Sequence, residues 1–215
     1  MRTKTLLLTA ALSAAGIATS QAQAVYSVNA VGYVNTTLAK GYNLVSNPLN
    51  NTATGGNLIK NLFASLTPGS QIFKFNSTTA KYDVAAVDEF SGVVEGAIAD
   101  VALPPGEGVF LNVAGPGTIT FVGEVPTGDL KNPIPKGLSI KASQVPQTGK
   151  ATTDLKYPAE DGDQIFVFNE TTQKYVVSGY DFGAWDTEPV IEVGDAVFIN
   201  ATTAKSWDRN FTIAP

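Results

Sequence analysis

The chain has 215 residues, a formal net charge of −5, and neither histidine nor cysteine. These counts exclude disulfide bonds, metal sites built on thiolate or imidazole, and a Ser-His-Asp triad. The acidic balance argues against binding to nucleic acid. Gly106 and Gly108 lack the lysine and the following helix of a phosphate-binding loop, so no nucleotide and no other cofactor is expected.

Residues 1–24 have the pattern of a signal peptide. Arg2 and Lys4 precede an apolar run over 6–18, and residues 22–24 read Ala-Gln-Ala, a small-x-small cleavage pattern. The run is shorter than the roughly 20 residues needed to span a bilayer. We predict cleavage between Ala24 and Val25, and a mature chain that is secreted, periplasmic or at the cell surface, without a membrane span.

The mature chain is expected to begin with a strand segment at 25–39. Residues 25–34 alternate between two sets of side chains, as a strand does. A strand at the edge of a sheet presents unpaired backbone groups that another chain can pair with. This segment therefore makes self-association one expected kind of partnership.

An internal repeat is the strongest signal in the sequence. Residues 71–82 recur at 164–175 with nine of twelve positions identical. Two further blocks, 106–112 and 40–44, recur in the same order at 194–200 and 136–140. The pattern predicts a first repeat at 40–125, a Pro-rich connector at 126–135 and a second repeat at 136–215.

Each repeat reads as short strands separated by turns, because its apolar residues alternate with a period of two. We predict an all-β fold of two homologous, sandwich-like or barrel-like halves related by a pseudo-twofold axis. Two arrangements fit, namely two small sandwiches in tandem or two halves sharing one core, and the short connector favours packed halves. One short helix is expected over 57–66, capped by Asn57, and a turn at its counterpart 152–157.

Several segments carry a resemblance to a known group of proteins. The segments at 25–35, 41–49, 121–126 and 143–147 together read like a family of exported β-rich repeat proteins of unknown function. These proteins are abundant in verrucomicrobial-type bacteria. The resemblance implies export and a β fold, and it brings no catalytic residue with it.

Residues that both repeats keep are most simply structural, whereas residues of one repeat alone are candidates for a site. The kept pairs, which we interpret as hairpin fixtures, are Gln71 and Gln164, Asn76 and Asn169, and Tyr82 and Tyr175. The aromatic and acidic residues found only in the second repeat are Tyr180, Asp181, Trp185, Asp186 and Trp207. Flat rings beside carboxylates are typical of carbohydrate contacts. The alternative is that Phe182 matches Phe90 as a core residue and that Trp185 fills a loop.

Residues 160–163 contain closely spaced carboxylates, and Asp161 and Asp163 are weak candidates for a calcium site. The full calcium-loop spacing is absent, and the first repeat has Thr-Pro-Gly-Ser at the same place. The simpler interpretation is a turn that leads into a strand.

These observations favour an exported, non-catalytic structural or interaction component of the cell surface, envelope or extracellular matrix. Its expected partners are polysaccharide or other envelope proteins. The alternative is a carbohydrate-binding module that uses the aromatic residues of the second repeat. A third hypothesis is a secreted glycan-active enzyme, for which Asp88, Glu89, Asp181 and Asp186 are candidates only because glycosidase chemistry needs two carboxylates.

Overall fold

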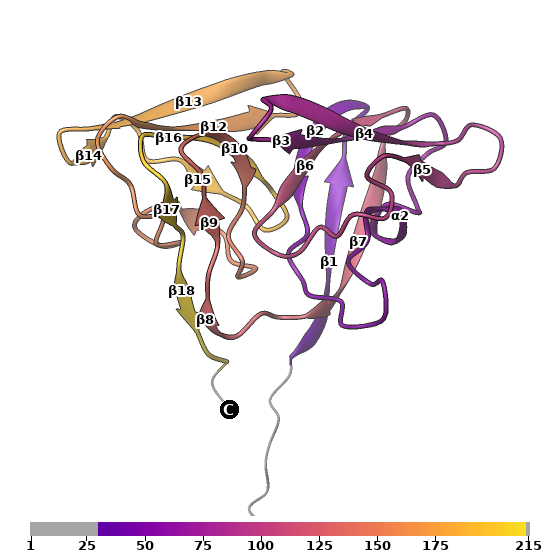
Figure 1. The fold of residues 1–215 in the computed structure, drawn as a ribbon, viewed down its shortest axis with the longest axis horizontal. Helices are drawn as coiled ribbons and strands as arrows, with labels where there is room; N and C mark the ends of the chain where they lie inside the picture. The colour runs from indigo at the N-terminus through magenta and orange to yellow at the C-terminus, as the bar shows by residue number, and fades with distance from the viewer. Residues whose placement is uncertain (1–29, 214–215) are drawn as a thin grey trace, which may run out of the picture.

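The computed structural model describes residues 30–213. The predicted signal peptide, its cleavage site and residues 25–29 of the predicted first strand lie outside this range. The fold is all-β and sandwich-like, with two halves arranged side by side (Figure 1). Within the described range, no helix has the length and apolar character needed to cross a bilayer.

The first half is built on a five-stranded antiparallel sheet. In spatial order its strands are β2 (Gly41–Ser46), β6 (Gly108–Val113), β3 (Gln71–Asn76), β4 (Lys81–Val87) and β5 (Val94–Gly96). A two-stranded antiparallel ribbon of β1 (Val31–Leu38) and β7 (Gly117–Glu124) packs beneath this sheet. Inward-facing residues of β7 are buried at every second position, as the alternation in its sequence predicts.

The second half repeats this arrangement strand for strand. Its five-stranded sheet has the order β10 (Gly137–Lys141), β16 (Val197–Ala201), β12 (Asp163–Asn169), β13 (Lys174–Asp181) and β14 (Ala184–Trp185). An additional short pair joins β11 (Gly149–Lys150) to β15 (Val190–Ile191). Shared strand order and shared pairing support the duplication read from the sequence.

The Pro-rich segment 126–135 belongs to the second half and is more than a connector. It contains β8 (Gly128–Leu130) and β9 (Pro133–Ile134), which pair with β18 (Arg209–Phe211) and β17 (Lys205–Ser206). This broken ribbon takes the place that β1 and β7 occupy in the first half. Each repeat therefore begins with a strand that pairs with the last strand of the same repeat.

The expected helix is present but short. Helix α2 spans Ile59–Leu62, and turns flank it within the predicted range. Asn57 does not cap it, because the cap residue is Leu58 and makes no side-chain hydrogen bond. Instead, Asn57 accepts hydrogen bonds from the Asn47 side chain and the Asn51 backbone N–H, at 3.1 and 3.0 Å. The counterpart at 151–155 is a turn, as predicted.

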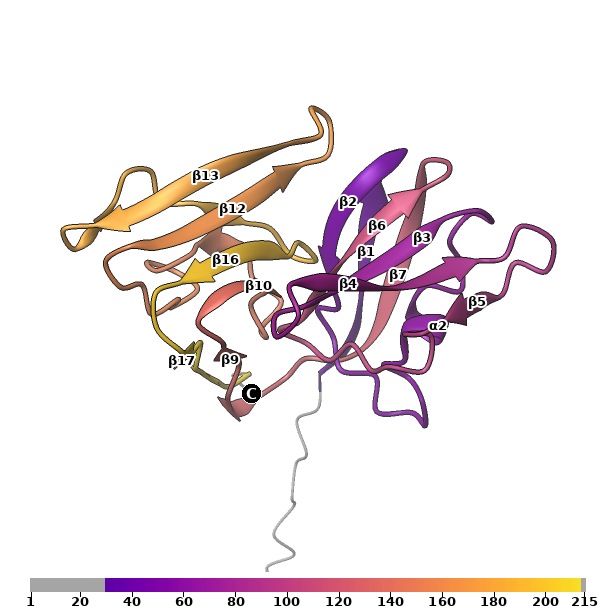
Figure 2. The same cartoon turned by 45° about the horizontal axis from the view of Figure 1, so that its top comes forward.

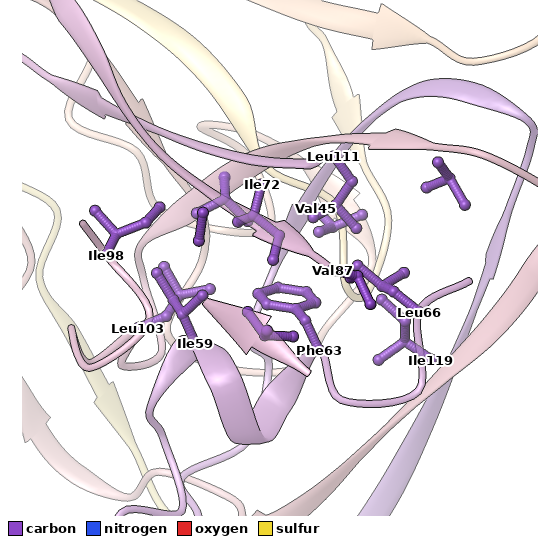
Figure 3. Close-up of a cluster of buried hydrophobic side chains, with 14 of the residues drawn as sticks. Val45, Ile59, Phe63, Leu66, Ile72, Val87, Ile98, Leu103, Leu111 and Ile119 are labelled. Carbon is purple, nitrogen blue, oxygen red and sulfur yellow. The ribbon is translucent and has the colours of Figure 1, made fainter. Parts of the chain in front are cut away.

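Each half encloses its own hydrophobic core. In the first half, Ile59 and Phe63 of the helical segment point toward Ile72 and Leu111 of the sheet (Figure 3). In the second half, the fully buried Trp207 packs against Tyr157, with ring centroids 5.5 Å apart. The separate cores correspond to the tandem arrangement, and a third cluster joins the halves.

The halves meet through reciprocal backbone contacts. Val45 bridges to Asp195, and at the equivalent positions Lys141 bridges to Glu107. Strand β3 lies against β10, and its equivalent β12 lies against β2. The tips of the β3–β4 and β12–β13 hairpins thus reach toward the opposite half (Figure 2). This exchange of contacts is a pseudo-twofold relation.

Candidate functional site

The outer faces of the two sheets carry aromatic side chains. On β3 the side chain of Ile72 is in the core, whereas Phe73 and Phe75 point to the other face, as strand alternation requires. Phe166 and Phe168 of β12 do the same in the second half. Both halves therefore present rings toward the junction.

Across the junction, the rings make a reciprocal pair of contacts. Phe110 lies nearly perpendicular to Phe168, with ring centroids 5.2 Å apart. The equivalent pair, Phe198 and Phe75, has a centroid distance of 5.4 Å and an angle of 77°. Edge-to-face pairs of this kind each stabilise by about 0.5–1.5 kcal/mol beyond the area they bury.

Two hollows open beside these contacts, and we call them the twin hollows. The first has a volume of about 320 Å³ and is lined by Tyr42, Phe73, Tyr82, Phe110, Phe168 and Tyr175. The second has a volume of about 340 Å³ and is lined by Leu138, Phe166, Tyr175, Phe198, Phe75 and Tyr82. Each residue of the first hollow has its repeat equivalent in the second. Tyr82 and Tyr175 line both.

The twin hollows differ at one position, where the first has Tyr42 and the second has Leu138. Gln173, at the tip of the β12–β13 hairpin, holds the Tyr42 backbone through two hydrogen bonds. Its side-chain oxygen accepts from Tyr42 N at 2.9 Å, and its side-chain nitrogen donates to Tyr42 O at 2.8 Å. The first repeat has Ala80 at the equivalent tip position, so only the first hollow has this support.

Tyr82 and Tyr175, which line both hollows, remain protonated at neutral pH. Burial raises the pKa of Tyr82. Burial, followed by the neighbouring Tyr82, raises the pKa of Tyr175 to about 12. Their side chains are nevertheless 42% exposed. The hollows therefore combine apolar ring faces with hydroxyl groups that can donate hydrogen bonds to a ligand.

Below the hollows the two sides of the junction differ in charge. Glu107 forms an ion pair with Lys74 and lies near the buried Lys141, whose pKa is lowered mainly by burial. The positions equivalent to Lys74 and Lys141 are Val167 and Val45, so neither carries a cation, and Val45 bridges to Asp195, the equivalent of Glu107. Burial is the largest cause that raises the pKa of Asp195 to about 6, and Glu170 and Glu192 add to it.

A small polar cavity of about 280 Å³ surrounds this carboxylate, with Asp195, Glu170 and Thr36 among its lining. The Thr36 hydroxyl is buried without a hydrogen-bond partner. Its repeat equivalent, Asn132, is long enough to donate to the carbonyls of Gly106 and Ala142, at 3.0 Å each. Thr36 thus lacks the hydrogen bonds that Asn132 makes at the equivalent position, and Asp195 lacks the lysine partner that Glu107 has.

The aromatic residues proposed from the second repeat form a packed cluster. Tyr180 contacts Trp185, and Trp185 contacts Tyr157, with centroid distances of 5.1 and 6.1 Å. The Trp185 indole N–H donates to the Thr152 hydroxyl at 2.9 Å. Trp207 is 1% exposed, so its ring is not available to stack on a sugar. We expected Trp207 to be available for a ligand, but this residue is part of the second hydrophobic core.

The acidic residues of the same segment lie at its surface. Asp181 is exposed at the end of β13, and the Asp186 carboxylate accepts from the Gly179 N–H at 3.1 Å. Asp161 accepts from the Gly183 N–H at 2.9 Å. These bonds shape the β13–β14 turn. They do not align the carboxylates with a ring face.

Phe90 and Phe182, expected as core residues, are both at the surface. They occupy equivalent turns, β4–β5 and β13–β14, and their side chains are 98% and 100% exposed. Phe182 adopts a left-handed backbone conformation with φ of 53°. The turn geometry points each ring away from its core.

Asp163 serves the fold and is fully buried at the start of β12. Its carboxylate accepts from Lys205 at 2.6 Å, Tyr157 at 2.9 Å and the Thr202 N–H at 2.9 Å. Burial opposes ionisation, but these hydrogen bonds together lower the pKa of Asp163. Within residues 30–213, no three His, Cys, Asp or Glu side chains gather closely enough to hold a metal ion.

The kept pairs have two different roles. Asn76 and Asn169 shape the hairpin turns, as predicted, because their side-chain oxygens accept from backbone N–H groups of Thr78 and Thr172. Tyr82 and Tyr175 instead form the shared wall of the twin hollows. Residues within the strongest repeat block therefore line both aromatic hollows. The interpretation that residues kept in both repeats are only structural did not predict this role of Tyr82 and Tyr175.

Comparison with protein-family models, with curated proteins and with solved structures finds no match to this chain.

Proposed function

We propose that this chain is an exported, non-catalytic interaction component of the cell surface, envelope or extracellular matrix that engages its partner through the twin hollows. The carrying observation is the duplicated aromatic surface. Each hollow is lined almost wholly by rings, and Tyr42, Tyr82 and Tyr175 are between 42 and 47% exposed. Exposed aromatic hollows of this kind are typical of binding sites.

The test compares a variant of the hollow rings with a variant of an exposed ring elsewhere on the molecule. In the hollow variant, Tyr82→Ser is combined with Tyr175→Ser, which removes the shared wall. In the control, Tyr33→Ser changes a ring that is 72% exposed on β1, away from the hollows. All three proteins are expressed in the producing cells, and cultures are separated into cell-associated material and medium.

The wild type and the Tyr33→Ser control are expected in the cell-associated fraction, and the hollow variant in the medium. Equal partition of all three proteins would contradict the role of the hollows. Recovery of the protein from the cytoplasm with residues 1–24 intact would contradict export.

Carbohydrate binding is the second candidate, and the hydroxyl groups of the hollow tyrosines favour it. A sugar has two candidate sites, the first hollow and the second-repeat cluster. Tyr42 lines the first and Trp185 belongs to the second, so variants of these two residues distinguish the sites. Calorimetric titration with a polysaccharide panel checks this candidate. Loss of binding in Tyr42→Ala assigns the hollow, loss in Trp185→Ala assigns the cluster, and no binding by the wild type removes the candidate.

A further inference from the structure

Two phenylalanines project from opposite ends of the molecule. The β4–β5 and β13–β14 turns, which carry Phe90 and Phe182, lie at the two ends of its longest axis (Figure 1). We call these turns the Phe tips. Full exposure of a phenylalanine forgoes the free energy of burying its ring, and here it occurs at both equivalent positions. A partner that covers the rings would recover this energy.

Hydrogen bonds give both Phe tips a defined shape. Asp88 accepts from the backbone N–H groups of Phe90 and Ser91, at 3.1 and 2.7 Å. In the other tip, Asp161 accepts from Gly183 N, directly after Phe182. An ordered turn presents its ring at a small entropy cost on binding.

The twin hollows have the size and chemistry to receive these rings. Each has a volume above 300 Å³, which leaves room for one phenyl group. Their walls are ring faces and edges, and such surfaces favour edge-to-face contact with an incoming ring. One molecule therefore has two tips and two hollows of matching chemistry.

Residues of opposite charge lie close in sequence to the tips and to the lining residues of the hollows. The tips are acidic, with Asp88 and Glu89 before Phe90, and Asp181 before Phe182. Four exposed lysines lie one or two residues before outer lining residues of the hollows in sequence; they are Lys40, Lys81, Lys136 and Lys174. Asp83, beside Tyr82, is an exception to this pattern. In a chain with a net charge of −5, these lysines bring positive charge to the segments that carry the hollow residues, and this favours an acidic partner surface.

We propose that the Phe tips of one molecule dock into the twin hollows of a second copy of this chain. The inference rests on the proposed function, because it names the partner of the hollows. Tip and hollow are different surfaces, so a contact made through one tip is heterologous. With two tips and two hollows on each molecule, further copies can add to a first pair.

The test is sedimentation velocity of the mature chain over a range of concentrations. The wild type is expected to form oligomers that grow with concentration. The double variant Phe90→Ser/Phe182→Ser is expected to stay monomeric, with an association constant at least tenfold lower. Because both rings are exposed, these changes leave the fold intact. The control Tyr33→Ser, which removes an exposed ring from β1, is expected to behave as the wild type does.

A mixing experiment checks the pairing directly. The tip variant keeps its hollows, and a second variant, Tyr82→Glu/Tyr175→Glu, keeps its tips but has charged hollows. Neither protein alone is expected to associate, whereas the mixture is expected to form heteromeric complexes. Association in the mixture supports docking of tip into hollow, and a mixture that stays monomeric overturns it.

Other results also decide the matter. A wild type that remains monomeric up to about 1 mM, or a tip variant that still associates, overturns self-docking. Loss of association in Tyr33→Ser alone would place the contact on β1. If only self-docking is wrong, the hollow variant is still lost from the cell-associated fraction. If the proposed function is wrong, the hollow variant remains in the cell-associated fraction, as the wild type does.

Discussion

Gly108 and Ala196 occupy equivalent positions of the two repeats and face each other at the contact between the halves. A Cβ atom added at Gly108 would lie only 2.3 Å from the Ala196 Cβ and 2.7 Å from Ile140 Cγ2. Two equivalent positions that meet near the pseudo-twofold axis thus share room for one methyl group. This is why a glycine stands in one repeat and an alanine in the other.

Gly108→Ala is expected to destabilise the chain by about 1–3 kcal/mol, because the added methyl forces the halves apart. Ala196→Gly in the same chain removes the opposing methyl and is expected to restore part of this loss. Urea unfolding of both single variants and the double variant measures the coupling. Purely additive effects would show that the two residues do not compete for one space.

Asp163→Asn is expected to lower the free energy of unfolding by about 3 kcal/mol, because it removes the nearer and fully buried of the two carboxylates that pair with the Lys205 ammonium and leaves only the half-exposed Glu160 at 3.1 Å. The lysine side chain is 7% exposed, so water compensates it poorly. Asp161→Asn, at an exposed position two residues earlier, is the control and should change stability by less than about 0.5 kcal/mol. Similar losses in both variants would contradict the structural role of Asp163.

The Asp163 carboxylate also makes the free energy of unfolding fall at acid pH. Its pKa is lower in the folded chain than in the unfolded chain, so its contribution is complete above the ordinary aspartate value of 3.8. Stability is lost as the pH falls through the folded value. Thermal unfolding between pH 5 and about pH 2 should therefore show a steeper acid loss in the wild type than in Asp163→Asn.

Asp195 changes the stability of the chain with pH in the opposite direction. Its pKa of about 6 in the folded chain lies above the ordinary value of 3.8, so the folded state binds the proton more tightly. The burial cost is complete above pH 6 and is relieved as the pH falls toward 4. Asp195→Asn is expected to stabilise the chain at pH 8 by about 1–3 kcal/mol and to have little effect at pH 4. Glu95→Gln, at an exposed position of β5, is the control, and an Asp195→Asn variant with equal effects at pH 8 and pH 4 would refute the prediction.

Val167→Lys is expected to supply the cation that Asp195 lacks. Its repeat equivalent, Lys74, pairs with Glu107, the residue equivalent to Asp195. The variant should lower the pKa of Asp195 and remove most of its pH dependence between pH 4 and 6. The change is followed by thermal unfolding at pH 8 and pH 4.5. Val167→Met, which is long but uncharged, should keep the pH dependence, and if Val167→Lys keeps it too, the charge argument is wrong.

Local pattern was enough for the strands and for the repeat. Phe73 and Phe75 alternate with Ile72 because a strand turns successive side chains to opposite faces, and this period is visible without coordinates. The same reasoning was insufficient for Asn57, because a cap and a long-range hydrogen bond use the same side chain. It was also insufficient for 126–135, where pairing with β17 and β18 depends on residues more than 70 positions away.

The site could be predicted only in part. Tyr82 and Tyr175 were visible as kept residues, but their common wall exists only because the hairpins lean toward opposite halves. Trp207 reads as a surface ring in a polar segment, yet it fills the second core. Phe90 and Phe182 read as core residues, yet turn geometry places them in solvent.

The amino-acid sequence by itself determined an all-β chain of two similar halves, since alternation and repetition are properties of neighbouring residues. Only the tertiary structure decided which faces meet, which rings are covered and which carboxylate lacks a cation. Those outcomes depend on how two nearly equivalent surfaces pack. At the contact of Gly108 with Ala196, for example, two alanines would collide.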